Sequence, residues 1–206
     1  MTLVIGLLGP AGAGKSTVAK YLLEKCYNAK VYSLAAPLKE IAKRVMLFTD
    51  EQLYGSQAQK EAPDIRYGFS ARTFLQRLGT DGIRNVLGLD IWIEACLRKI
   101  KVEGPDVAIV EDLRFINEAS AFRNADKKYP GLFGYVWRLV PPPGDETTDY
   151  AIAAGLHPSE REWFDAPYDS SLEPDGRGVA KLQQLVDVVL EQYPIPQPRP
   201  NGQIGY

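Results

Sequence analysis

Residues 9–16 read GPAGAGKS, and this stretch decides the fold of the chain. It matches the pattern GxxxxGK[ST], a glycine-rich loop that joins a buried strand to a helix. The apolar run 3–8 precedes the loop and is typical of a buried parallel strand. After the loop, residues 15–26 place their apolar side chains at helical spacing. The motif therefore occurs in the strand-loop-helix context that it requires.

The residue types in this loop favour the binding of a nucleoside triphosphate. The glycines allow backbone conformations in which successive N–H groups point at one anion, and the positive end of the following helix adds to that field. Lys15 can reach the β- and γ-phosphates, and Ser16 can ligate Mg²⁺. An ordinary turn has no need of Lys-Ser at its end. We assign the ATP contacts to Ala11, Gly12, Ala13, Gly14, Lys15, Ser16 and Thr17.

The rest of the chain alternates strand-like and helix-like segments. Further strands are expected at 30–34, 107–110 and 132–140, and further helices at 37–47, 70–78, 90–100, 116–124 and 179–189. Ser70 can cap its helix, which Gly79 should interrupt. The alternation predicts an α/β fold with a parallel sheet and helices on both faces. The turn after Leu8 and the acidic pair Glu111-Asp112 should then share the carboxyl edge of the sheet.

Length and composition favour one domain of a non-membrane protein. The chain has 206 residues, of which 45% are hydrophobic, and domains hold roughly 100–200 residues. We expect a single domain over 1–192, mobile lid segments at 48–70 and 141–162, and a Pro-rich tail at 193–206. Two cysteines make no disulfide framework, and no apolar run approaches the ~20 residues that span a bilayer. These features predict a cytoplasmic protein.

Three further segments carry a family resemblance. Residues 32–40 (YSLAAPLKE) resemble A-x-P-[LI]-K-[DE], and residues 70–81 (SARTFLQRLGTD) with Trp92 resemble R-x-x-[LM]-Q-x-L-G-T-[DE]…W. Residues 110–118 (VEDLRFINE) resemble D-x-R-x-x-x-E. On these segments and the glycine-rich loop, the chain resembles the phage-type deoxynucleoside monophosphate kinases, a family of P-loop nucleotide kinases. Arg138 and residues 157–160 (HPSE) echo two more family signatures; the lone His157 is given no catalytic role.

The resemblance implies a P-loop NTPase fold like that of adenylate kinase, with mobile lid and monophosphate-binding segments. It implies transfer of the γ-phosphoryl group of ATP to a deoxynucleoside monophosphate with Mg²⁺, giving the diphosphate and ADP for phage DNA synthesis in the host cytoplasm. The implied catalytic residues are Lys15, Asp112, Arg114 and Arg138. The implied substrate-binding residues are Lys39, Arg72, Gln76, Gly79, Thr80, Asp81, Trp92 and Glu118. Ser16 and, through water, Asp112 would hold the metal.

The residue chemistry agrees with two bound anions but leaves alternatives open. Arginine suits phosphate because its planar fork binds two oxygens, yet Arg114 could pair with Asp112, and Trp92 could be a core aromatic. A monophosphate is mostly a dianion at neutral pH and needs no base, whereas a carboxylate base would help the reaction of an alcohol acceptor. The alternatives are a kinase acting on a hydroxyl, such as hydroxymethyluracil in phage DNA, and a non-catalytic nucleotide-binding regulator. Net charge −2 argues against a polymeric nucleic-acid partner, and a homodimer is left open.

Overall fold

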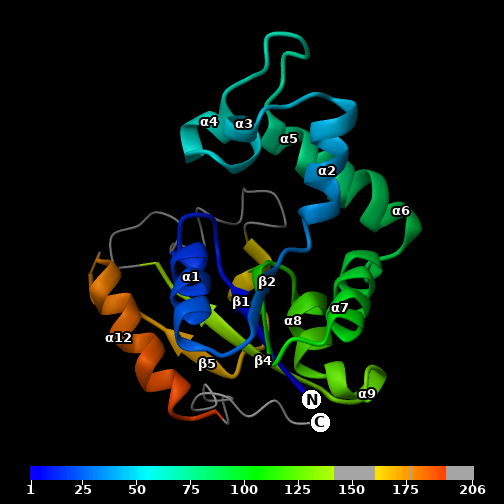
Figure 1. The fold of residues 1–206 in the computed structure, drawn as a ribbon. Helices are drawn as coiled ribbons and strands as arrows, with labels where there is room; N and C mark the ends of the chain where they lie inside the picture. Colours follow the sequence, from blue (N-terminus) through cyan, green and yellow to red (C-terminus); the bar gives the residue numbers. More distant parts are fainter. Residues whose placement is uncertain (142–160, 177, 194–206) are drawn as a thin grey trace. The chain divides into compact units, whose positions relative to one another are not determined.

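The computed structural model describes residues 1–141, 161–176 and 178–193 (Figure 1). The chain divides into two compact units, one formed by Met1–Ser33 with Cys96–Tyr206 and the other by Leu34–Ala95. Most of the expected 141–162 lid, His157 and all but the first residue of the Pro-rich tail lie outside the described residues. The larger unit is described first.

A five-stranded parallel sheet forms the centre of the larger unit. Its strand order is β2-β3-β1-β4-β5, and every neighbouring pair is parallel. The bounds are Thr2–Leu8 (β1), Ala29–Tyr32 (β2), Val107–Leu113 (β3), Leu132–Leu139 (β4) and Ser170–Leu172 (β5). The predicted parallel α/β sheet is confirmed. The short β5 was not predicted, because Ser-Ser-Leu carries no apolar run.

Helices cover both faces of this sheet (Figure 1). The helices of the larger unit are α1 (Lys15–Lys25), α8 (Ile116–Arg123), α9 (Ala125–Lys128), the 3₁₀ turn η3 (Glu162–Phe164) and α12 (Val179–Leu190). On one face, Val18 of α1 and Val186 of α12 share a buried core with Ile5 and Trp137. On the other face α8 lies so close to β4 that a Cβ on Gly134 would approach a backbone oxygen of α8 to 1.7 Å. Glycine at this position is therefore a packing requirement.

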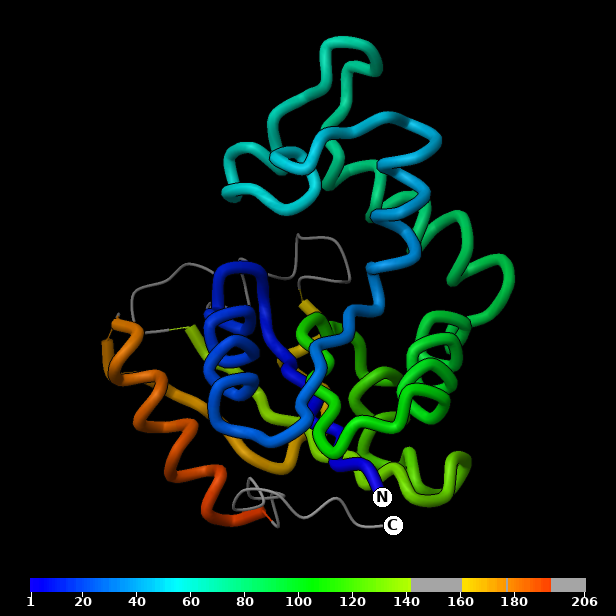
Figure 2. Tube along the Cα trace, in the orientation of Figure 1, coloured from blue at the N-terminus to red at the C-terminus, as the bar shows by residue number. Residues whose placement is uncertain are grey.

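The carboxyl edge of the sheet gathers the segments that the sequence analysis singled out. Leu8 ends β1 and pairs with Leu113 of β3 on one side and with Arg138 of β4 on the other. Gly9 follows Leu8, so the glycine-rich loop leaves the sheet between β3 and β4 (Figure 2). The predicted shared edge for the loop and the acidic pair is confirmed.

Strand β3 runs further than predicted. It does not close at Val110 but passes through Glu111-Asp112 and ends at Leu113. Gly6 of β1 pairs with Val110 while Leu8 pairs with Leu113, so β3 carries one extra residue at the acidic pair. Such a bulge re-aims side chains and is common beside active sites. The two acidic residues therefore do not end β3, because the bulge accommodates them within the strand.

The smaller unit is helical. Its elements are α2 (Ala36–Val45), α3 (Asp50–Tyr54), α4 (Gln57–Glu61), α5 (Ala71–Gln76), the π-helix η1 (Arg77–Arg84) and α6 (Asn85–Leu87). Helix α7 (Ile91–Glu103) begins in this unit and ends in the larger one. Phe48 packs against the rings of Tyr67 and Phe74, with centroid separations of 5.7 and 5.8 Å. These aromatic side chains build a separate small core.

The segment 48–70 carries more structure than its polar sequence suggested. Helices α3 and α4 each begin with a reciprocal capping box, formed by Thr49 with Gln52 and by Ser56 with Gln59. Behind them, the buried Asp64 accepts hydrogen bonds from the side chains of Gln52 and Arg66. The segment is thus held by local caps and one buried carboxylate, and its movement as a lid stays a prediction.

The expectation that Gly79 interrupts its helix is wrong. Ser70 caps α5 as predicted, accepting a hydrogen bond from the Thr73 N–H, but α5 then continues without a break into η1. Gly79 lies inside η1, where an added Cβ would stand 2.6 Å from a methyl carbon of Leu38. Glycine is needed here for close approach of α2, and the wider π-helical turn keeps the chain helical.

Two simple predictions about the chain can be checked directly. Cys26 and Cys96 are both buried and free, as expected for a chain without a disulfide framework. Burial raises the pKa of the Cys26 thiol to about 11 and that of Cys96 to about 12. In the described part of the chain, no helix combines the length and apolar character needed to cross a bilayer.

Candidate active site

The glycine-rich loop has the backbone geometry of an anion cradle. Gly12 and Gly14 adopt left-handed conformations with φ of 83° and 91°, which other residues rarely tolerate. Gly9 packs so closely that a Cβ there would lie 2.5 Å from the backbone oxygen of Leu139. Gly14 is the N-cap of α1 and provides no side-chain cap, and the first turn of that helix holds no acidic residue. The helix therefore presents its positive end at the loop.

Lys15 is buried within this cradle. The residue is only 8% exposed, and Nζ donates hydrogen bonds to the carbonyl oxygens of Gly9 at 2.7 Å and Pro10 at 2.6 Å. A buried ammonium is costly unless such partners satisfy it. The two bonds hold the cation at the loop itself, where the sequence motif places it.

Asp112 lies in the β3 bulge beside the loop. Ser33, the residue after β2, donates its hydroxyl hydrogen to Oδ2 of Asp112 at 2.6 Å. The parallel pairing of Tyr32 with Val110 brings these two chain segments together. Sequence reasoning missed Ser33, because the strand expected at 30–34 placed this hydroxyl inside the strand, whereas β2 ends at Tyr32.

Glu118 has a structural role in the turn that carries Arg114. The Glu118 carboxylate is buried, and its Oε2 accepts hydrogen bonds from the backbone N–H of Arg114 at 2.7 Å and of Phe115 at 3.0 Å. Acceptance of N–H groups at a helix start satisfies donors that the helix itself leaves unpaired. Glu118 therefore fixes the main chain of Arg114, and its predicted substrate contact stays a prediction.

Arg138 lies at the carboxyl end of β4, on the other side of the loop strand. Its side chain is 20% exposed and forms an ion pair with Glu173, with Nη2 and Oε1 at 3.3 Å. The guanidinium carbon stands 3.9 Å from the centre of the Tyr168 ring. Among the described residues no group accepts a hydrogen bond from its buried Nε. The larger unit thus collects Lys15, Asp112 and Arg138 at one sheet edge.

In the smaller unit, the predicted cations occupy helix surfaces. Arg72 lies in the first turn of α5, and its Nε is 3.8 Å from a carboxylate oxygen of Glu61. Nζ of Lys39, on α2, stands 4.6 Å from the centre of the Tyr54 ring. Gln76 ends α5 on a partly buried position, one helical turn after Arg72.

The Gly-Thr-Asp segment lies inside η1 rather than in a loop. Gly79 and Thr80 are buried, whereas Asp81 is exposed. Trp92, near the start of α7, donates from Nε1 to the carbonyl oxygen of Gly79 at 3.1 Å. This bond satisfies the polar atom of a partly buried indole, so Trp92 has a clear packing role within the smaller unit.

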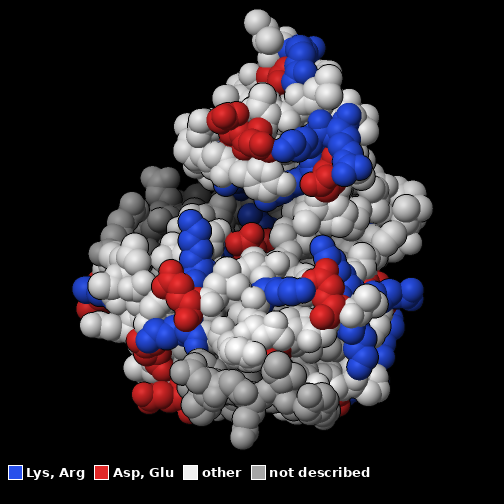
Figure 3. Space-filling model, in the orientation of Figure 1, with Lys and Arg blue, Asp and Glu red and all other residues white. Residues whose placement is uncertain are grey.

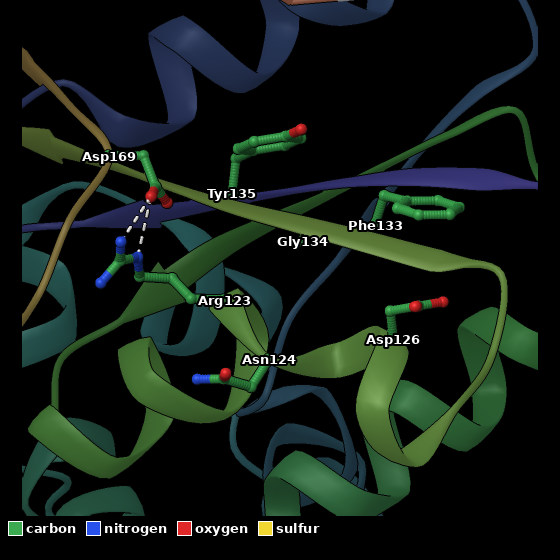
Figure 4. A pocket seen from close by; sticks show the side chains of 7 residues that line it. All are labelled: Arg123, Asn124, Asp126, Phe133, Gly134, Tyr135 and Asp169. Atoms are coloured by element: carbon green, nitrogen blue, oxygen red, sulfur yellow. Dashed lines mark hydrogen bonds and ion pairs between the residues drawn. The ribbon is translucent and has the colours of Figure 1, made fainter.

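A hollow of about 350 Å³ opens elsewhere in the larger unit, beside the amino half of β4 (Figure 4). Its lining residues are Arg123, Asn124, Asp126, Phe133, Gly134, Tyr135 and Asp169. Arg123 forms an ion pair with Asp169 at 2.8 Å, and Asp169 also accepts a hydrogen bond from the N–H of Val136. The hollow lies toward the opposite end of β4 from Arg138 and contains none of the predicted site residues.

Comparison with known proteins identifies the family of the chain. No family model matches the chain. A protein of Acanthamoeba polyphaga mimivirus, provisionally named deoxynucleotide monophosphate kinase, is 35% identical over 175 residues, which cover 77% of this chain and 81% of the relative. The deoxynucleoside-5'-monophosphate kinase of Escherichia phage T5 is 26% identical over 185 residues, with 61% of this chain and 74% of the phage protein covered.

Among solved structures, the tunicamycin resistance protein of Deinococcus radiodurans superposes with a TM-score of 0.52 over 97% of this chain and 100% of that chain. At 13% identity this likeness shows a common fold alone. The parallel sheet and the glycine-rich loop with its buried lysine agree with the identity to the mimivirus protein. The chain is therefore a kinase with a P-loop NTPase fold, and it belongs to the deoxynucleotide monophosphate kinase family.

Proposed function

We propose that this kinase transfers the γ-phosphoryl group of ATP to a deoxynucleoside 5′-monophosphate, giving the deoxynucleoside diphosphate and ADP. The observation that carries the proposal is the carboxyl edge, where Leu8 pairs with both Leu113 and Arg138 and the cradle around Lys15 follows at once. The names of the mimivirus and T5 relatives support the choice of acceptor. Residues 1–192 would act as one kinase domain that supplies nucleotides for phage DNA synthesis in the host cytoplasm.

The donor set at this edge fits Mg²⁺. Mg²⁺ prefers oxygen ligands and is usually held by one or two carboxylates together with substrate phosphates and water. The Ser16 hydroxyl, in the first turn of α1, and the Asp112 carboxylate supply such oxygens. The described residues hold no group of three or more His, Cys, Asp or Glu side chains that could bind a metal. When bound, the ion would neutralise charge on the β- and γ-phosphates.

The residues of the larger unit would bind the phosphoryl donor. The loop residues 11–17 would contact the triphosphate through backbone N–H groups, and Lys15 would leave its carbonyl partners for phosphate oxygens. Arg114 would lie near the transferring group, and Arg138 would bind the same anion from the β4 side. Fixed cations at the position where charge develops lower the barrier without reorganisation at the moment of transfer.

The residues of the smaller unit would bind the acceptor. Lys39 and Arg72 would hold its phosphate, while Gln76, the Gly79–Asp81 segment and Trp92 would contact the nucleoside. A bond forms from an acceptor phosphate oxygen to the γ-phosphorus as the bond from that phosphorus to the β,γ-bridging oxygen breaks. The acceptor is mostly a dianion at neutral pH, so the reaction needs no general base. Asp112 therefore serves the metal rather than proton transfer.

The direct test is product analysis with a panel of acceptors. The protein is incubated with ATP and Mg²⁺ and each of the four deoxynucleoside monophosphates, and in parallel with DNA that contains hydroxymethyluracil. We expect diphosphate formation with at least one monophosphate and no labelled DNA from γ-labelled ATP. On the face drawn in Figure 3, basic and acidic side chains are interspersed, which supports a small acceptor over a polymer. Labelled DNA without any diphosphate would replace the proposal with the hydroxyl-kinase alternative.

A further inference from the structure

Two side chains outside the predicted site hold Arg138. Tyr168 precedes β5 and Glu173 follows it directly, so the pair flanks this three-residue strand. Ser171 of β5 is the register partner of Arg138 on β4. The edge strand that the sequence did not predict therefore brings both side chains to the cation at the carboxyl edge.

The contacts restrain the guanidinium in two different ways. The centre of the Tyr168 ring lies 3.9 Å from the guanidinium carbon, well within the range of a cation–π contact, and holds the guanidinium over the ring. The Glu173 carboxylate lies 3.3 Å from Nη2 and limits rotation within the guanidinium plane. The Ser171 hydroxyl donates to the same Glu173 oxygen at 2.6 Å, so the carboxylate is itself oriented. Together the two contacts restrain the orientation of the Arg138 guanidinium.

The backbone that carries Tyr168 is anchored to β4. The N–H of Asp169 donates to the carbonyl oxygen of Val136 at 2.7 Å, and the Asp169 carboxylate accepts from the Val136 N–H at 2.8 Å. Arg123 clamps the other carboxylate oxygen of Asp169 at 2.8 Å. Figure 4 shows this pair of side chains beside β4. Tyr168 therefore belongs to a segment that is hydrogen-bonded to β4, the strand that carries Arg138.

We propose that Tyr168 and Glu173 are positioning residues that hold the Arg138 guanidinium ready for the triphosphate at the edge from which the P-loop leaves. The inference rests on the proposed function, because it takes Arg138 to bind the phosphoryl donor. Pre-orientation matters since a long flexible side chain must otherwise be ordered during binding, and small misplacements of a cation are costly in catalysis. We expect Tyr168 to contribute more than Glu173, because Tyr168 is 39% exposed whereas the Glu173 carboxylate is 59% exposed and its ion pair is weakened by solvent.

The test is a double-mutant cycle on kcat and on the KM values for ATP and the monophosphate. Tyr168→Leu should lower kcat/KM for ATP about five- to tenfold with little change in the monophosphate KM, and Tyr168→Phe should restore most of it because the ring face remains. Glu173→Gln should cost about two- to threefold. In an Arg138→Ala background, Tyr168→Leu should have almost no further effect. Tyr27→Leu, an exposed tyrosine of the same unit, is the matched control.

Several results would overturn the inference. If Tyr168→Leu lowers kcat/KM for ATP equally with and without Arg138, the role of Tyr168 is merely structural. The same conclusion follows if Tyr168→Phe loses as much activity as Tyr168→Leu. If Tyr168→Leu does not fold, Glu173→Gln in both backgrounds carries the same cycle, and additive losses there reject the proposal. Absence of monophosphate turnover in the unmodified protein overturns the proposed function instead. The cycle is then measured on ATP dissociation constants by calorimetry, where absence of coupling rejects the positioning role.

Discussion

Ser33 donates its hydroxyl hydrogen to Oδ2 of Asp112 across 2.6 Å, which joins the residue after β2 to the carboxylate in the β3 bulge. A hydrogen bond to a charged acceptor is stronger than one between neutral groups. It fixes one oxygen of the only carboxylate that we assign to the metal. The orientation of Asp112 therefore depends on a neighbouring strand and not on its own segment alone.

Replacement of Ser33 by alanine should impair metal use. Loss of a hydrogen bond to a charged group costs about 1.5–3 kcal/mol, so Ser33→Ala should raise the Mg²⁺ concentration for half-maximal activity by about tenfold or more. Ser33→Thr keeps the hydroxyl and should remain close to the unmodified protein. The measurement is initial rate against Mg²⁺ concentration at saturating ATP. An unchanged Mg²⁺ dependence in Ser33→Ala would remove Asp112 from the metal site.

Lys15→Ala should abolish turnover while the fold survives. Removal of a cation that stabilises developing charge costs at least about a hundredfold in kcat. The two hydrogen bonds of the side chain described above stay within the loop, at the carbonyl oxygens of Gly9 and Pro10, and we expect the melting temperature of Lys15→Ala to change little. The exposed Lys20 of α1 gives the control variant Lys20→Ala, which should keep full activity. Turnover in Lys15→Ala near the control level would exclude the P-loop from the mechanism.

Arg72→Ala should act on the acceptor rather than the donor. Arg72 lies on α5 in the smaller unit, and loss of a phosphate contact should raise the monophosphate KM about tenfold while the ATP KM stays within about twofold. Arg77, the exposed first residue of η1, provides the control Arg77→Ala. Kinetics with each substrate varied in turn check the split. Equal changes in both KM values would show that Arg72 supports the fold and does not contact the acceptor phosphate.

Two glycines of η1 should respond oppositely to alanine. A Cβ on Gly79 would stand 2.6 Å from the buried Leu38, so Gly79→Ala should destabilise the protein by about 1 kcal/mol or more. A Cβ on Gly82 would meet its nearest atom, the Arg77 carbonyl oxygen, at 3.5 Å. Gly82→Ala should therefore be neutral or stabilising by up to about 1 kcal/mol. Urea unfolding followed by circular dichroism measures both, and matching losses would refute close packing at Gly79.

Asp64 should contribute to stability at neutral pH but not in acid. The hydrogen bonds from Arg66, and then that from Gln52, hold the pKa of the Asp64 carboxyl well below its usual range. A lowered folded-state pKa gives stability that is present above the unfolded value of about 3.9 and is lost as pH falls toward the folded value. Asp64→Asn should be less stable than the unmodified protein at pH 7, with the difference shrinking below about pH 4. Urea unfolding of both proteins at pH 7 and below about pH 4 measures this difference in the free energy of unfolding. A difference that is the same at the two pH values would contradict the prediction.

The local elements were predictable because short-range chemistry decides them. The GPAGAGKS loop requires a strand before it and a helix after it, and β1 and α1 occur where the apolar run and the helical spacing placed them. Ser70 was recognisable as a cap because a hydroxyl before a helix satisfies a free N–H group. The parallel sheet followed from the alternation of strands and helices.

The errors have physical causes as well. The glycine at position 79 is typical of a helix end, but it lies inside η1, where it allows the close approach of Leu38. The acidic pair at the end of the predicted 107–110 strand is accommodated by a bulge that depends on pairing with β1. Each outcome was decided by a partner distant in sequence.

The sequence by itself determined the glycine-rich loop, since the left-handed Gly12 and Gly14 and the carbonyl partners of Lys15 lie within residues 9–16. Only the tertiary structure decided which groups surround it. Strand pairing places Arg138 beside the loop, brings Ser33 to Asp112, and adds an edge strand that carries Tyr168 to the guanidinium. Hydrogen bonds between parallel strands join residues far apart in the chain, and no local pattern records such long-range pairing.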